Sequence, residues 1–497
     1  MAQDQAGYRK LMKASSLFGG VQVIHIVINL VRSKLVAMLL GPAGMGVNGL
    51  LMSSLTLMTS LTSFGLATSA ARNVAAAKGQ KDELKVRKIA SILRTTVWGT
   101  GAFGALATFA LSGVLSKSSF GDSSYSWAFK VLAVTLLFNQ ISAGQGVLMR
   151  GMGELKLMAK NSLAGAFIGF ILSLPFYYLY GIEGLVPAIF VNAVANLLIC
   201  SFYAAKIKLP KVAVSFKELR QEGGDMLKMG AMLSLNWLIS LFTAHLARLY
   251  VSDLGGIEQV GFYSAGFTIV SSYVGMVFTA MSADFYPRLS GKANDNLQAG
   301  LLINQQGEIA LLILGPLLGC FIIFMPDLIK LIYSADFLEI RWMIQWAALG
   351  IIFKAGSWAM GFLALAKGDS KLYFFNELAT NSYMLLFNIG GYYLWGLEGL
   401  GVAFLLGYFI SFFQQAIVNR RVYGFLLNGR FWKVFASEFC MLALLFFVVF
   451  YNDRLIQTPW GYTRYLILLV IIVFSGLYLI KRLALEDRVW GLLGINR

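Results

Sequence analysis

The sequence has little charge and few of the residues that build catalytic or metal sites. Charged residues make up 13% of its 497 positions, whereas an average soluble domain has about 25%. It contains two histidines and three cysteines, and Cys200, Cys320 and Cys440 are too far apart to form a metal-ligand motif. We therefore predict no metal site and no cofactor, and we expect the three cysteines to be thiols within the membrane.

The sequence also lacks a polar stretch long enough to fold as a soluble catalytic domain. We find no glycine-rich phosphate loop of defined pattern and no Ser/His/Asp set with room outside the apolar runs. The basic N-terminus, MAQDQAGYRKLMKASS, has no small-residue cleavage site and predicts a retained first helix. These absences argue against an enzyme, including a membrane polymerase or ligase, which would need a long outer loop with clustered charges.

Long apolar runs dominate what is present. Hydrophobic residues make up 58% of the chain, and its mean hydropathy is +0.70. Each run has about the 20 residues that span a hydrocarbon core. We predict an all-α polytopic membrane protein with helices near 15–40, 47–72, 90–115, 125–149, 157–180, 184–206, 228–253, 259–284, 306–332, 341–364, 372–395, 397–420, 433–451 and 464–482.

The net charge of +17 follows this topology. With the N-terminus inside, most of the 41 Lys and Arg fall in cytoplasmic loops and tails, while acidic residues gather at the opposite face. The excess of positive charge therefore indicates orientation and contact with anionic membrane lipids, and it excludes nucleic acid as the partner. Both termini are predicted to be cytoplasmic.

An internal repeat runs through the chain at an offset of 215 residues. GIEGLVPA at 181–188 matches GLEGLGVA at 396–403, GELKLMAKNSLA at 153–164 matches GDSKLYFFNELA at 368–379, and GPAGMG at 41–46 falls on GIEQVG at 256–261. Because each copy has six helices, both copies insert in the same orientation. We predict two six-helix lobes related by a pseudo-two-fold axis around a central cavity, at 1–210 and 211–425, and a helix pair at 426–497.

Six cations remain once the Lys and Arg of the cytoplasmic loops, the tails and the opposite face are assigned. A charge near the bilayer centre costs about 2.5–3.5 kcal/mol on insertion scales, so each one needs an explanation. Lys130 and Arg94 lie near helix ends, where long side chains reach the interface. Arg32, Lys34, Arg248 and Lys354 are candidates to line a cavity, although Lys34 and Arg248 could also extend outward.

Histidine and asparagine accompany these cations. His25, Asn29 and Arg32 have spacings of four and three, which place them on one helical face, and His245 precedes Arg248 by three. The histidines could equally be packing residues. No carboxylate in the same helices pairs with these cations, so the pattern favours binding of an anion, and guanidinium groups suit phosphate. Glu308, Glu377 and Asp284 are candidates to couple a proton or sodium ion.

Three segments carry a resemblance to a known family: KLVAMLLGPAGMGVNGL at 34–50, SAARNVAAAKGQKDELKVRKIASILR at 69–94 and ADFYPRLSG at 283–291. On these segments the chain, over roughly residues 10–425, resembles the multidrug/oligosaccharidyl-lipid/polysaccharide exporter superfamily, and most of all its O-antigen translocases, the Wzx-type flippases.

In the related lipid II flippases an arginine stands nine residues before the glycine that ends the first helix, as Arg32 stands before Gly41. Lys34 matches a basic position of the O-antigen type. Ser60 stands where the lipid II branch has an arginine, which argues against lipid II as substrate.

The resemblance implies a flippase of the bacterial inner membrane. Its substrate would be an undecaprenyl-pyrophosphate-linked oligosaccharide, moved from the cytoplasmic to the periplasmic leaflet by alternating access. An ion gradient would drive it, a polysaccharide polymerase or ligase could be its partner, and a monomer would suffice. A drug/cation antiporter of the same fold is the alternative, but it would need buried carboxylates in the first or seventh helix.

Overall fold

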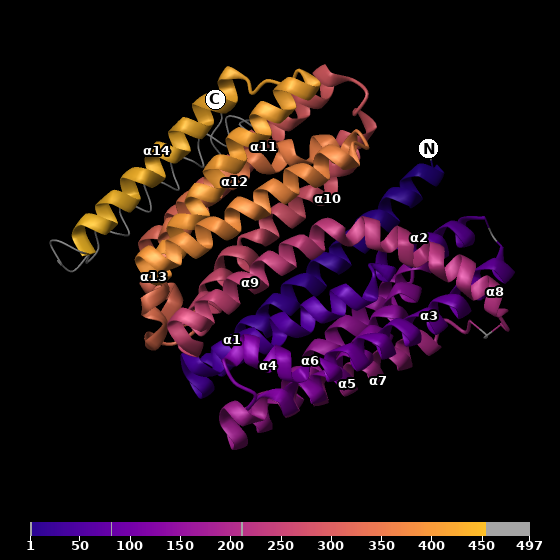
Figure 1. Cartoon of the computed structure of the whole chain (residues 1–497). Helices are drawn as coiled ribbons and strands as arrows, with labels where there is room; N and C mark the ends of the chain where they lie inside the picture. The colour runs from indigo at the N-terminus through magenta and orange to yellow at the C-terminus, as the bar shows by residue number, and fades with distance from the viewer. Residues whose placement is uncertain (1, 81, 210–211, 454–497) are drawn as a thin grey trace, which may run out of the picture. The chain divides into compact units, whose positions relative to one another are not determined.

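The computed structural model of the chain describes residues 2–80, 82–209 and 212–453. The elements in these ranges are helices (Figure 1). They form two compact units: unit 1 comprises Met1–Gly261 with Ile332–Ser334, and unit 2 comprises Phe262–Leu331 and the chain from Ala335 onward. The predicted division into lobes at 1–210 and 211–425 and a helix pair at 426–497 stays a prediction.

Unit 1 is built from long helices with short connections. Their apolar faces pack on one another, and Leu93, Val74 and Leu148 belong to its buried core. The elements are α1 (Ala2–Ser63), α2 (Leu66–Gly79), α3 (Glu83–Ala110), α4 (Ser112–Phe120), α5 (Ser126–Gly151), α6 (Leu155–Tyr180), η1 (Gly181–Gly184), α7 (Leu185–Ala205), α8 (Phe216–Glu218), η2 (Leu219–Gly223) and α9 (Gly224–Thr268), the last of which continues past Gly261 into unit 2.

Unit 2 is arranged around α12, most of whose side chains are buried. Glycines of α11 face large side chains of α14: a Cβ on Gly307 would approach the Phe431 ring, and one on Gly315 would collide with the Glu438 carboxylate. The remaining elements are η3 (Ile269–Tyr273), α10 (Gly275–Gly291), α11 (Asn296–Ile332), η4 (Ala335–Ile340), α12 (Arg341–Ala366), α13 (Ser370–Tyr423) and α14 (Gly429–Tyr451) (Figure 1).

The lengths of the helices identify a multi-span membrane protein. Within the described residues, eight helical stretches are long and apolar enough to cross a membrane, or nine if the bent pair α3 and α4 is one crossing. Four of them have 40 to 76 residues, whereas one crossing needs about 20. Each of these four contains a backbone break, at Gly41, Gly181, Gly256 or Gly396. The total of fourteen stays a prediction, because helix 464–482 lies outside the described residues.

The backbone has matched breaks at the offset of the internal repeat. Gly41 (φ 64°, ψ −168°) and Gly256 (φ 81°, ψ 179°) are 215 residues apart and break α1 and α9 in the same way. Gly181 (φ 55°) and Gly396 (φ 56°) do the same at the next matched position. A side chain would strain each of these conformations, so glycine is required in both copies.

The segments after the first matched pair contact each other reciprocally. A Cβ on Gly46 would collide with the carbonyl oxygen of Ile257, and a Cβ on Gly261 would collide with that of Pro42. Positions 42 and 46 correspond to 257 and 261 under the repeat. Such a reciprocal pair of contacts is what a local two-fold axis produces.

A second matched contact shows how the copies have diverged. In unit 1, Gly169 of α6 leaves room for the Asn192 side chain of α7. In unit 2, the corresponding positions of α13 are Met384 and Gly407, and the methionine now packs against the glycine. The glycine is at the first of the two matched positions in one copy and at the second in the other, while the helical segments still approach each other at the same place.

Two predicted helices are wrong in detail. The helix expected at 47–72 is interrupted at Phe64 and Gly65, which both have positive φ, because α9 crosses there: a Cβ on Gly65 would collide with the carbonyl oxygen of Gly230. The helix expected at 90–115 ends at Ala110, and α4 continues at an angle of 61°. Both bends depend on tertiary packing or local geometry that helical periodicity does not encode.

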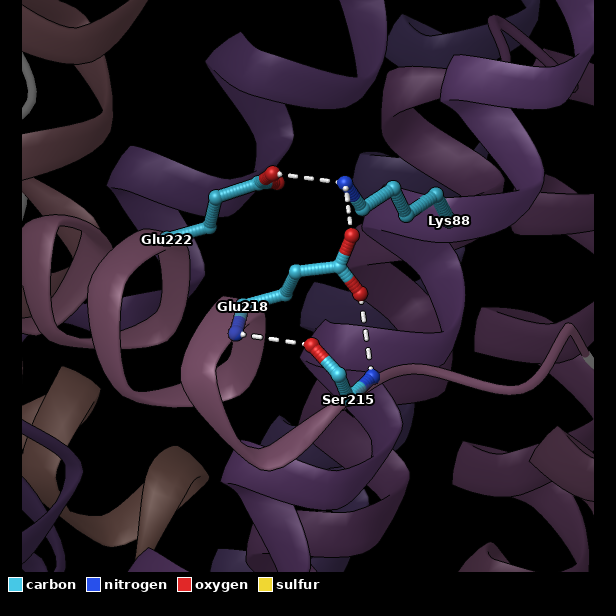
Figure 2. A network of polar contacts seen from close by, with 4 residues as sticks. All are labelled: Lys88, Ser215, Glu218 and Glu222. Carbon is cyan, nitrogen blue, oxygen red and sulfur yellow. Dashed lines mark hydrogen bonds and ion pairs between the residues drawn. The ribbon is translucent and has the colours of Figure 1, made fainter.

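A network of polar contacts fastens the segment before α9 to α3 (Figure 2). Lys88 Nζ lies 2.8 Å from Glu218 Oε1 and 3.1 Å from Glu222 Oε1. Ser215 caps α8, because its hydroxyl accepts a hydrogen bond from the Glu218 amide while its own amide donates to the Glu218 carboxylate. These partners lower the pKa of Glu218 to about 2, chiefly through Lys88, and they raise the pKa of Lys88.

We expect Glu218→Gln to increase hydrogen exchange of the backbone amides in 212–222 severalfold over wild type at pH 7. A lowered pKa contributes stability in full above the ordinary value of 4.5 and loses it as pH falls towards about 2. The ratio of variant to wild-type exchange should therefore shrink below pH 4.5. Lys88 stays charged throughout that window, because even its ordinary pKa of 10.5 lies far above it. Glu83→Gln, which removes the exposed pair with Arg87, is the matched control, and a ratio that is constant down to pH 3 would contradict the assignment.

Candidate functional site

A cavity of about 330 Å³ lies between α1, α6 and α7 in unit 1, and we call it the α1–α6–α7 pocket. From α1 it is lined by His25, Asn29 and Arg32, which the sequence spacing places on one face. The polar side chains that line it from the other two helices are Asn161, Ser162, Asn192 and Asn196.

Two contacts join α1 to α6 at this pocket. His25 Nε2 lies 2.7 Å from Ser162 Oγ and 3.1 Å from the Ser162 carbonyl oxygen. Arg32 Nη2 donates a hydrogen bond of 3.1 Å to Tyr177 Oη. At 1.5 Å per residue, Arg32 is about 13 Å before the break at Gly41, well inside the span. A guanidinium has five N–H donors, and the Tyr177 bond is the one that the described residues accept from Arg32.

Glycines of α6 create the space. Gly165 and Gly169 are four residues apart, so they lie on one face of α6, a small-residue spacing that lets membrane helices approach closely. That face meets Asn196 and Asn192 of α7: a Cβ on Gly165 would be 3.1 Å from Asn196 Oδ1, and one on Gly169 would collide with Asn192. The close approach of the helices therefore positions both amides at the pocket.

The amides of the pocket are largely unused by the protein. Among the described residues, the side chains of Asn29, Asn192 and Asn196 have no hydrogen-bond partner, and Asn161 Oδ1 is buried without one. No carboxylate lines the pocket in this part of the chain. The pocket thus combines one cation with neutral groups that can both donate and accept hydrogen bonds.

Sequence reasoning missed Asn161, Ser162, Asn192 and Asn196. One signal was available, because Asn192 and Asn196 are four residues apart in an otherwise apolar helix, opposite a helix with glycines at the same spacing. Polar side chains at one helical face within a membrane are costly unless they have partners or line a cavity.

The other candidates of unit 1 lie elsewhere. Lys34 is half-buried on α1 and does not line the α1–α6–α7 pocket. His245 is buried on α9, with its Nδ1 3.1 Å from Ser53 Oγ of α1. Arg248 Nη1 donates a 3.2 Å bond to the Ala244 carbonyl oxygen of its own helix. Their contact with a ligand stays a prediction.

Lys354 belongs to unit 2 and is half-buried on α12. Its Nζ lies 5.1 Å from the ring centre of Tyr408 and 5.5 Å from that of Phe278. Cation–π contacts of this kind stabilise a charge in partly apolar surroundings by about 0.5–2 kcal/mol. The two rings therefore offset part of the cost of placing this lysine within a membrane span.

The acidic candidates are dispersed. Glu308 is buried on α11, Glu377 is half-buried on α13, and Asp284 is exposed and pairs with Arg288 at 2.9 Å. Their role in ion coupling stays a prediction. Glu438 of α14 is also buried. No cluster of three His, Cys, Asp or Glu that could hold a metal occurs within the described residues, where the three cysteines are free.

Comparison with known proteins identifies both family and fold. Residues 35–342 match the family model described as polysaccharide biosynthesis protein. The lipid III flippase of Escherichia coli (strain K12) is 22% identical over 419 residues, which cover 81% of this chain and 96% of that protein. The corresponding protein of Shigella flexneri matches equally.

Solved structures share the fold at low sequence identity. The lipid II flippase MurJ in an inward closed conformation superimposes with a TM-score of 0.68 at 14% identity, covering 95% of this chain and all of that one. An inward-facing MATE family transporter of the MOP superfamily gives 0.67 at 15% identity, covering 80% and 94%. The predicted MATE-like fold is confirmed. Because the family model covers more than half of its residues, the chain belongs to the polysaccharide biosynthesis protein family.

Proposed function

We propose that the chain is a flippase for a lipid-linked oligosaccharide. The observation that carries this is the α1–α6–α7 pocket, which holds one guanidinium and a set of amides within membrane helices of a polysaccharide biosynthesis family member. The relatives, among them the lipid III flippase, are transporters. The chain is therefore a transporter and not an enzyme.

The chemistry of the pocket fits a pyrophosphate-linked sugar. A pyrophosphate that crosses hydrocarbon needs a polar, positively charged path, and the bidentate geometry of guanidinium suits phosphate oxygens. In our proposal Arg32 binds the pyrophosphate, while the prenyl tail stays in lipid. Further candidates to contact the substrate are Lys34, Arg248, Lys354, His25 and His245. A drug/cation antiporter gains no support, because no carboxylate lines this pocket among the described residues.

The substrate that we propose is an O-antigen or similar repeat unit on undecaprenyl pyrophosphate. It would be moved from the cytoplasmic to the periplasmic leaflet of a bacterial inner membrane, by alternating access of the two repeats and with an ion gradient as energy source. The lipid III flippase relative and the match at Lys34 support this choice, and Ser60 argues against lipid II.

Transport by the purified chain in liposomes tests the function. Fluorescent undecaprenyl-pyrophosphate-linked oligosaccharide is placed in both leaflets, and a membrane-impermeant quencher reports the fraction that reaches the outer leaflet. We expect the chain to make the protected fraction accessible, and protein-free liposomes to keep it protected. Equal protection with and without protein, under every ion gradient applied, would refute the flippase assignment.

A further inference from the structure

The amides of the α1–α6–α7 pocket include acceptor oxygens that an anion alone would leave without a hydrogen bond. Pyrophosphate oxygens only accept hydrogen bonds, so a phosphate site needs donors. Asn161 Oδ1 is an acceptor, it is buried without a partner, and the amide nitrogen of the same side chain is directed to the Cys200 sulfur. This oxygen calls for a ligand that donates a hydrogen bond, such as a sugar hydroxyl or an acetamido N–H.

The length of the α1 face that lines the pocket and the volume of the pocket allow two chemical groups to bind side by side. His25 and Arg32 are seven residues apart on α1, about 10 Å along the helix axis. Arg32 is at the end near Tyr177, and His25 is at the end near Ser162. A volume of about 330 Å³ is at the lower limit for small-molecule sites. It suits one sugar ring and not an oligosaccharide.

A packing role explains these asparagines less well. Amides within a membrane often bond across helices and hold them together, and the second repeat shows that case. Asn376, the counterpart of Asn161, donates to Gln415 Oε1 at 3.2 Å and accepts from Gln414 Nε2 at 2.8 Å. In the first repeat, Asn192 and Asn196 have no such partners among the described residues.

We propose that the α1–α6–α7 pocket binds the sugar ring next to the pyrophosphate, through Asn161, Asn192 and Asn196. This proposal rests on the proposed flippase function and deepens it. It assigns sugar binding to the asparagines and pyrophosphate binding to the arginine. A site built to bond hydroxyl groups discriminates strongly against a ligand that lacks them.

Binding in nanodiscs tests this with two probes. One is the pool of polyprenyl-pyrophosphate-linked oligosaccharides extracted from the membranes of the cells that encode the chain, and the other is undecaprenyl pyrophosphate without sugar. For wild type we expect the extracted pool to bind about tenfold tighter than the sugar-free lipid. Asn161→Ala and Asn192→Ala should lower this ratio to about one and leave the affinity for the sugar-free lipid unchanged. Arg32→Ala should weaken binding of both probes.

Two further variants separate ligand contact from folding. Gly169→Ala keeps every amide but pushes Asn192 aside, and it should also lower the ratio. Asn376→Ala is the matched control in the second repeat: it can lower thermal stability, yet it should keep the ratio of wild type. A ratio near one in wild type, or an unchanged ratio in the Asn161 and Asn192 variants, would overturn the sugar site while flipping in liposomes persists. Binding of neither probe by wild type would refute the flippase function as well.

Discussion

Replacing Arg32 by alanine is expected to reduce flipping of the lipid-linked oligosaccharide at least tenfold without lowering thermal stability. Burying a guanidinium in a membrane span costs about 2.5–3.5 kcal/mol, so its removal should leave the fold as stable as before or more so. Its partner Tyr177 is buried and loses this hydrogen bond, a cost of about 1–3 kcal/mol that the gain offsets. The measurement is the rate of flipping in liposomes, together with the midpoint of thermal unfolding.

Three variants sharpen the result. Arg32→Lys keeps the charge but loses the fork geometry, so we expect an intermediate rate. Tyr177→Phe removes one hydrogen bond to Arg32 and should lower the rate of flipping only a few-fold. Lys130→Ala is the matched control, because Lys130 is an exposed cation over the Phe109 ring at a helix end. If Lys130→Ala and Arg32→Ala slow flipping equally, the effect is one of net charge and not of the pocket.

Gly46→Ala and Gly261→Ala should be among the most damaging single methyl additions in unit 1. Each new Cβ would collide with a backbone carbonyl, that of Ile257 or Pro42, and backbone cannot move aside as a flexible side chain can. We expect a cost near the upper end of the range of about 1–3 kcal/mol for overpacking. That corresponds to a fall of several degrees in the unfolding midpoint and to weak flipping.

Gly99→Ala is the control for glycine replacement itself. Gly99 lies within α3, and a Cβ there would meet no atom within 4 Å. Alanine has a higher helix propensity than glycine by about 1 kcal/mol, so this variant should be at least as stable as wild type. Should Gly46→Ala prove as stable as Gly99→Ala, the segments at 42–46 and 257–261 do not touch as described.

The sequence predicted many helix ends well because glycine marks backbone conformations that other residues adopt only with strain. Gly41, Gly256, Gly181 and Gly396 were found as matched letters of a repeat, and each proved to be a position that only glycine tolerates without strain. Helix ends that depend on such breaks, such as Tyr180 in α6, were predicted correctly. The interruption at Phe64 was missed because its cause is a crossing helix far away in the sequence.

The site was predicted in part, for a similar reason. The face with His25, Asn29 and Arg32 follows from helical spacing alone, and it lines a pocket. The opposite wall could not be derived, because nothing in α1 indicates which helices pack against it. Asn161 shows the limit: its counterpart Asn376 is also an asparagine, and only the structure shows that the Asn376 amide oxygen accepts a hydrogen bond within the protein and the Asn161 oxygen does not.

The exchange of Gly169 and Asn192 for Met384 and Gly407 has an evolutionary consequence. In a symmetric homodimer every substitution appears twice, so a polar cavity gained in one subunit is imposed on the other. Fusion of two copies into one polypeptide removes that constraint. One half could then keep an open, amide-lined wall while the other filled the equivalent space with a methionine side chain. Two halves within one chain can differ in this way while both keep the matched glycine breaks.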